Sequence, residues 1–323
     1  MRTVQRIRRL LMLGSVLCII GGSVWSQNPD TTAARKYGWG FRNFKDTLFT
    51  WDIYSHAFFG VPVDPEGTWL SATFDKLFYE QAFRKKLPDP DNDGGLGNCY
   101  GISLMRLMVN RFGGYEGYCG PTSSYRGDTV WSDAQGPDDP GLRRMINIMH
   151  GRQLSLASIE TYLDQAQFGH SQNANFAVTL ARQAIGKEGP CIISITKTTN
   201  PISGGGHSLI AYGVTTDGSG HSKIWVVDPN RLWAVPSSRD RGWYQGDSNY
   251  VACDPGGSWH FTMKGGDVWP QSGGHVIIIP ISLIGTPGRV PSSLGLSVSE
   301  LLSKFFLSGE MRQDKNRELK IED

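Results

Sequence analysis

Residues 204–230 read GGGHSLIAYGVTTDGSGHSKIWVVDPN. Two apolar runs flank the polar, glycine-containing segment TTDGSGHS, which is the pattern of two strands joined by a turn. The first strand is entered at His207 after three glycines, and the second ends in Asp228-Pro229-Asn230. A hairpin with its turn near Gly218 would place Asp228 beside His207. This stretch therefore predicts both a sheet and a histidine–carboxylate pair.

The segments around this hairpin predict the fold class. Extended patterns lie on either side of it, in PCIISIT (190–196), SWHFTM (258–263) and HVIIIPI (275–281). Helical patterns dominate earlier in the chain, and helices are expected over 73–87, 99–112, 140–150, 155–167 and 174–187. Helices followed by strands are typical of an α+β fold, in which a helical lobe packs against an antiparallel β-sheet lobe.

The helix expected after residue 98 carries a cysteine in its first turn. In CYGISLMRLMVNRFGG, the residues Met105, Met108, Val109 and Phe112 are spaced i, i+3, i+4 and i+7, with Asn98 as the N-cap and Gly113-Gly114 as the stop. A helix N-terminus stabilises negative charge and so favours the thiolate of Cys99, which is the nucleophilic form. Gly97 and Gly101 would let a substrate backbone approach closely.

A nucleophilic cysteine also needs a base, and the chain has seven histidines. His207 is favoured because it stands at the mouth of a strand and has Asp228 on the paired strand. A carboxylate there would hold the imidazole in the required tautomer. His275, in SGGHVIIIP, is the rival candidate, but no acidic residue follows it on a paired strand.

Three motifs in this order, GNCYGIS, GGGHSLIAYGV and IWVVDPN, resemble the papain-like cysteine peptidase superfamily, in its bacterial exported branches. The resemblance covers residues 37–285 and implies a papain-like α+β fold. It implies Cys99 as the nucleophile, His207 as general base and then acid, and Asp228 as the orienting group. Asn230 is the alternative orienter, because some members use an asparagine.

The resemblance has one departure. Members commonly place a glutamine several residues before the cysteine to help form the oxyanion hole, and no glutamine stands between Gln81 and Cys99. Asn98 or Asn92 could replace it, together with the backbone N–H of Cys99. Loss of one oxyanion donor costs about 10²–10³ in rate.

Three functions are therefore open. The first is a peptidase that hydrolyses amide bonds of a peptide or protein substrate through an acyl-enzyme. The second is a cell-wall amidase or acyl transferase with the same cysteine–histidine chemistry. The third is a catalytically silent domain that binds a partner, which the missing glutamine favours. No cofactor is expected, and a net charge of +2 gives no reason to expect nucleic acid.

The two ends of the chain predict export and a tail. Residues 1–26 combine an arginine-rich start, an apolar run of 15 residues (10–24) and Ser26, which indicates a signal peptide and a secreted or periplasmic protein. The alternative is an uncleaved anchor, although the run is short of the roughly 20 residues of a membrane span. Residues 27–36 are a polar lead-in, 37–285 the hydrolase domain, and 286–323 a charged helical or polar tail.

Two further features leave alternatives open. Cleavage after Ser26 would leave four cysteines, and with Cys99 free at most one disulfide can form among Cys119, Cys191 and Cys253, with the pairing undetermined. Asp89, Asp91 and Asp93 resemble the start of a calcium loop. The twelfth loop position would be Tyr100 instead of the glutamate that binds calcium, so a polar turn is favoured.

Overall fold

The computed structural model describes residues 36–46, 49–62, 75–84, 97–127, 136–167, 173–199, 206–231, 249–263, 266–270 and 273–286. The predicted signal peptide (1–26), almost all of the lead-in (27–36) and almost all of the tail (286–323) lie outside these residues. So do Asn92 and the calcium candidates Asp89, Asp91 and Asp93.

An antiparallel sheet forms one half of the described structure. In the described residues it has seven strands, in the order β6-β5-β4-β3-β2-β1-β7. The strands are β1 (Cys191–Thr196), β2 (Gly206–Thr216), β3 (Ser222–Val227), β4 (Tyr250–Cys253), β5 (Trp259–Thr262), β6 (Val268–Trp269) and β7 (Val276–Ile279). The hairpin expected from residues 204–230 is the β2–β3 pair in the middle of this order.

Helices form the other half. They are α3 (Trp51–Phe59), α6 (Cys99–Phe112), α7 (Pro140–Gly151), α8 (Leu156–Gln167), α9 (Ala174–Glu188) and α10 (Ile281–Ile284), with short helices η1 (Tyr79–Phe83), η2 (Thr122–Ser124) and η3 (Arg152–Leu154). Local sequence explains their ends. Asp139 caps α7 by accepting from the N–H groups of Gly141 and Leu142, and Gly113 ends α6 in the left-handed conformation at φ 69°. Mixed helices and an antiparallel sheet give the α+β class expected from the sequence.

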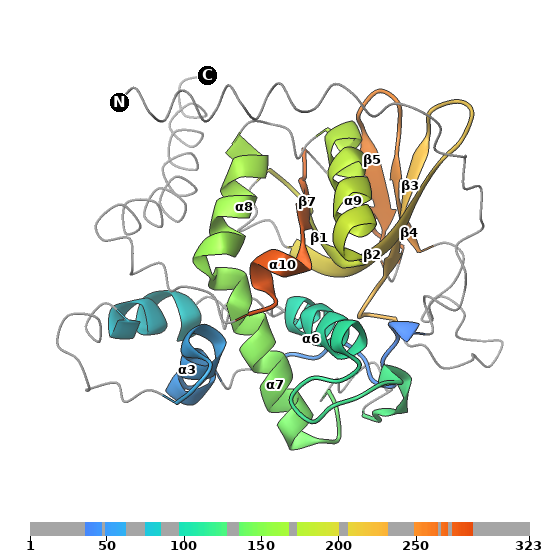
Figure 1. The fold of residues 1–323 in the computed structure, drawn as a ribbon. Helices are drawn as coiled ribbons and strands as arrows, with labels where there is room; N and C mark the ends of the chain where they lie inside the picture. The colour runs from blue at the N-terminus through green and yellow to red at the C-terminus, as the bar shows by residue number, and fades with distance from the viewer. Residues whose placement is uncertain are drawn as a thin grey trace, which may run out of the picture.

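Both faces of the sheet are buried, each against different helices (Figure 1). Along β1, Ile192 packs into the core shared with α6 and α7, whereas Ile193 and Ile195 pack into the core beneath α9. The alternation follows the two-residue period of a strand. Because both faces are covered, the strands read as nearly continuous apolar runs, which is why β1, β2 and β7 were recognisable in the sequence.

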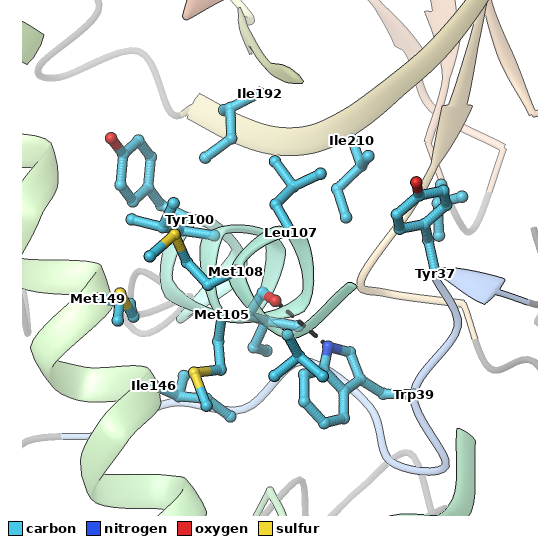
Figure 2. Close-up of a cluster of buried hydrophobic side chains, with 14 of the residues drawn as sticks. Tyr37, Trp39, Tyr100, Met105, Leu107, Met108, Ile146, Met149, Ile192 and Ile210 are labelled. Atoms are coloured by element: carbon cyan, nitrogen blue, oxygen red, sulfur yellow. Dashed lines mark hydrogen bonds between the residues drawn. The ribbon is translucent and has the colours of Figure 1, made fainter. Parts of the chain in front are cut away.

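The helix that carries Cys99 lies inside the first of these cores. Figure 2 shows α6 surrounded by Ile192 and Ile210 of the sheet, by Ile146 and Met149 of α7, and by Trp39. Trp39 is fully buried, and its Nε1–H donates to the Ile102 carbonyl oxygen at 3.2 Å. The N-terminal segment around Trp39 is therefore packed into the same core as α6.

Some elements differ from expectation. Helices α3 and α10 and strands β4 and β6 were not predicted; β6 spans only two residues, too short for a clear pattern. The helix expected over 73–87 is described for 75–84, and Tyr79–Phe83 of it form a π-helix. Tyr79 and Phe83 both pack edge to face against Tyr54 of α3, with ring centroids 5.6 and 5.2 Å away.

Candidate active site

Cys99 is the first residue of α6, where the backbone N–H groups have no partner within the helix. Tyr100 N–H donates to the Cys99 sulfur, Gly101 N–H to His150 Nδ1 at 3.4 Å, and Ile102 N–H to the Asn98 carbonyl oxygen at 2.9 Å. The Cys99 N–H donates to no atom of the described residues. One N–H beside the thiol thus has no acceptor among the described residues.

The two glycines near Cys99 serve packing inside the molecule. A Cβ at Gly101 would overlap the Ile146 carbonyl oxygen and His150 of α7, and a Cβ at Gly97 would overlap the Asn43 amide. The expectation that these glycines let a substrate backbone approach is therefore wrong, because atoms of the protein itself occupy the space beside them. They let α7 and the N-terminal segment approach the start of α6.

A β-bulge in the hairpin sets the face on which Asp228 lies. The β2–β3 register shifts between Ala211 and Gly213, so that Val227 pairs with Ile210. Val227 and Ile210 share the α6 core, and Asp228, the next residue, lies on the same side as His207, whose Nε2 it meets at 2.7 Å. A one-residue slip in register would reverse this, because paired residues share a face.

The two side chains meet as the hairpin predicted. His207 Nε2 lies 2.7 Å from Asp228 Oδ1, and both residues are buried. Because Nε2 is bonded to the carboxylate, Nδ1 is the ring nitrogen that makes the hydrogen bond with the Cys99 thiol. The N–H of Ser208 also donates to the Cys99 sulfur, at 3.4 Å. The structure thus brings Cys99, His207 and Asp228 together in one chain of contacts.

The electrostatics of this chain favour a thiolate beside an imidazolium. Burial alone would raise the pKa of the Cys99 thiol, but the hydrogen bond and charge of His207, with the N–H groups of Ser208 and Tyr100, outweigh it and lower the pKa. Burial alone would lower the pKa of His207, but Asp228 and then Cys99 raise it to about 10. Each partner therefore stabilises the charge on the other.

Two arginines near Asp228 could not be foreseen from the motifs. Burial would raise the pKa of the Asp228 carboxyl, yet His207, Arg231 and the Asn230 N–H together lower it. Arg231 Nε lies 3.5 Å from Asp228 Oδ2. Arg106 of α6 is 1% exposed, with its guanidinium 5.7 Å from the Trp39 ring centroid, and it also interacts electrostatically with Asp228. The carboxylate is therefore held in its charged form inside the protein.

The other candidates lie as follows. Asn98 is buried at the N-cap position, but its side chain makes no capping hydrogen bond, and its Nδ2 donates to Asn147 Oδ1 at 2.7 Å. Asn147 in turn donates to Asp46 Oδ2, so the carboxylate fixes the direction of both bonds. Asn230 contacts His207 Nε2 at 3.3 Å. His275 is near Thr196 and Thr199, with Nε2 3.0 Å from the Thr199 carbonyl oxygen.

A hydroxyl cluster beside Cys99 was also missed. Tyr162 of α8 contacts the hydroxyls of Ser194 and Ser208, which lie 2.9 Å apart, and burial with the nearby Cys99 charge raises the pKa of Tyr162 to about 12. Ser194 and Ser208 are paired residues of β1 and β2. Only the order of the strands could have indicated this contact, because the three residues are far apart in sequence.

The remaining cysteines form no disulfide within the described residues. Cys119 is exposed, and Cys191 and Cys253 are buried free thiols, with pKa values that burial raises to about 12. Within the same part of the chain, no cluster of His, Cys, Asp and Glu is suited to hold a metal ion. A helix with the length and apolarity needed to cross a membrane is likewise not found there.

Acid should destabilise the protein through His150 of α7, whose Nδ1 accepts from the Gly101 N–H of α6. Burial lowers the pKa of His150 to about 3, so the folded state binds one proton fewer than the unfolded state between about pH 6.5 and 3. The free energy of unfolding should fall by about 1.4 kcal/mol per pH unit there as the pH drops. We expect His150→Asn, whose amide oxygen can accept from Gly101, to remove that slope in urea unfolding at pH 4, 5 and 6. Parallel slopes for the two proteins would contradict this assignment.

Comparison of the chain with protein-family models, with curated protein sequences and with solved structures gives no match. The case for a function therefore stands on the geometry around Cys99.

Proposed function

We propose that this chain is a papain-like cysteine hydrolase that cleaves amide bonds of peptides through an acyl-enzyme on Cys99. The observation that carries the proposal is the buried chain from the Cys99 thiol through the His207 ring to Asp228, in which the pKa of the thiol is lowered and the pKa of the imidazole is raised. Perturbed pKa values with matched partners are typical of catalytic groups. Export, and the tail beyond residue 285, remain proposals from the sequence.

The geometry supports the following steps. The Cys99 thiolate attacks the carbonyl carbon, and the oxyanion accepts a hydrogen bond from the Cys99 N–H. His207 gives its Nδ1 proton to the leaving amine, the C–N bond breaks, and a thioester remains on Cys99. His207, now neutral, takes a proton from water as the water attacks the thioester, and the acid leaves with Cys99 again a thiolate. Asp228 keeps Nε2 protonated throughout and holds the ring in position.

A catalytically silent binding domain is the second candidate. It is favoured by one observation: Asn98 directs its amide nitrogen to Asn147, which leaves the Cys99 N–H as one oxyanion donor that the described residues identify. The amidase or transferase alternative uses the same three residues and differs only in substrate.

Turnover separates these possibilities. We expect the wild type to cleave an unstructured peptide library at pH 6–7, with a mass increase on Cys99 from the trapped acyl group, and Cys99→Ala to do neither. Cys119→Ala is the matched control, because it removes an exposed thiol that makes no contact with the candidate site in the described residues. A mass increase on Cys99 with transfer to an added amine instead of water would favour the transferase. No adduct and no cleavage would contradict the hydrolase proposal.

A further inference from the structure

Asn43 connects the two sides of the candidate site, although no motif marks it. Its backbone N–H donates to the Pro229 carbonyl oxygen at 3.0 Å, and its side-chain amide lies 2.9 Å from that of Asn230. Its amide is also packed against Gly97, where an added Cβ would overlap it. Asn43 thus touches the start of the nucleophile helix and the loop that follows Asp228.

The donors and acceptors around His207 Nε2 indicate what the contact between Asn43 and Asn230 does. A carboxylate can only accept, so the 2.7 Å contact between Asp228 Oδ1 and His207 Nε2 requires a hydrogen on Nε2. The Asn230 amide lies 3.3 Å from the same Nε2 through its Nδ2 atom, which is also a donor. Two donors cannot share a hydrogen bond. The contact becomes favourable when the amide is turned by half a revolution, so that Asn230 Oδ1 accepts from Nε2–H.

The neighbouring amide can follow that turn. With Asn230 Nδ2 now facing Asn43, a half-turn of the Asn43 amide presents Oδ1 to it, and the hydrogen bond between the two residues is kept with its direction reversed. Asn43 Oδ1 is buried and accepts no hydrogen bond from the described residues in the orientation with Nδ2 toward Asn230, so the turn breaks no bond there.

We propose that Asn43 is a positioning residue: it orients the Asn230 amide so that the amide oxygen and Asp228 together hold His207 Nε2–H, with Nδ1 directed at Cys99. The inference rests on the proposed function. It explains why the N-terminal segment, 187 residues away in sequence, is hydrogen-bonded to the loop that carries Asn230. Removal of either amide should make the charged form of His207 less stable and, because the two charges stabilise each other, should also reduce the thiolate fraction of Cys99.

A double-mutant cycle tests whether Asn43 acts through Asn230. The readout is the pH at which alkylation of Cys99 by iodoacetamide reaches half its maximum, with the labelled cysteine identified by mass spectrometry. We expect Asn43→Leu and Asn230→Leu each to raise this pH by about one unit, a tenfold loss of thiolate on the acid limb. The double variant should match either single variant, because the relay is already broken.

Controls separate positioning from general damage. Asn110→Leu removes another partly buried amide hydrogen bond, to the Arg106 carbonyl oxygen, and should leave the alkylation profile unchanged. Asn43→Ala gives the same test with less bulk if the leucine variant lowers the melting temperature. The charged groups around His207, namely Cys99, Asp228, Arg231 and Arg106, are unaltered in all these variants.

The possible outcomes distinguish a failure of the positioning role from a failure of the proposed function. Additive shifts from Asn43→Leu and Asn230→Leu, or an equal shift from Asn110→Leu, would overturn the positioning role while leaving the proposed function intact. A wild-type Cys99 that reacts only above about pH 8 would overturn the proposed function and the positioning role with it.

Discussion

Asp228→Asn should lower peptide hydrolysis by about 10⁴ and also destabilise the fold. An asparagine at this position can present its N–H₂ group to His207 Nε2, which favours the wrong tautomer, and in serine-protease triads the equivalent change costs about that factor. The stability loss has a separate cause. Asp228 is fully buried and faces Arg231 Nε at 3.5 Å, with Arg106 also buried nearby. Removing the carboxylate leaves buried cations without their counter-charge, which costs about 3–5 kcal/mol.

Initial rates and urea unfolding of the same protein samples measure both effects. Asp164→Asn is the matched control, because Asp164 is exposed on α8 and should change neither quantity. A variant with normal stability and normal hydrolysis would contradict the placement of Asp228 as the residue that orients His207. A loss of stability with unchanged hydrolysis would make Asp228 purely structural.

His207→Ala should move the alkylation of Cys99 from the acid side of the ordinary thiol range to above about pH 8.5. The histidine supplies the largest contributions that lower the pKa of the thiol, and without it the burial of Cys99 works in the opposite direction. An isolated thiol has a pKa of about 8.5 before burial is considered. Because the variant loses the largest contributions that lower the pKa of the thiol, this is the largest expected change in the reactivity of the site.

Alkylation followed by peptide mass mapping reports each cysteine separately. Cys119 is the internal reference because it is exposed, and its profile should be the same in both proteins. His275→Ala is the matched histidine control, since His275 contacts Thr199 and should leave the Cys99 profile unaltered. A Cys99 profile that moves with His275→Ala instead would make His275 the base.

The sequence allowed the hairpin and the helix to be predicted because each depends on local patterns. Nearly continuous apolar runs on either side of the DGSG turn predict β2–β3, and helical spacing from Cys99 to Phe112 predicts α6. These two elements carry Cys99, His207 and Asp228, which were grouped because a nucleophilic cysteine needs a base and because the motifs resemble the papain-like superfamily.

The parts that could not be predicted depend on tertiary contacts. The bulge between Ala211 and Gly213, which turns Asp228 to the side of His207, has no local signature beyond one glycine. Gly101 owes its identity to α7, and Asn98 directs its amide to Asn147 because Asp46 fixes the chain of donors. Arg106 lies on the buried side of α6, where its spacing predicts an apolar residue.

The most direct test of the account is the protonation state of His207, measured by ¹⁵N NMR on protein labelled in its histidine rings, with the His207 signals assigned by comparison with His207→Ala. Because Asp228 and Cys99 raise the pKa of His207 to about 10, both ring nitrogens should remain protonated from pH 5 to pH 8.5. Loss of a ring proton near pH 6.5, the ordinary value for histidine, would show that no thiolate–imidazolium pair exists and would contradict the proposed hydrolase.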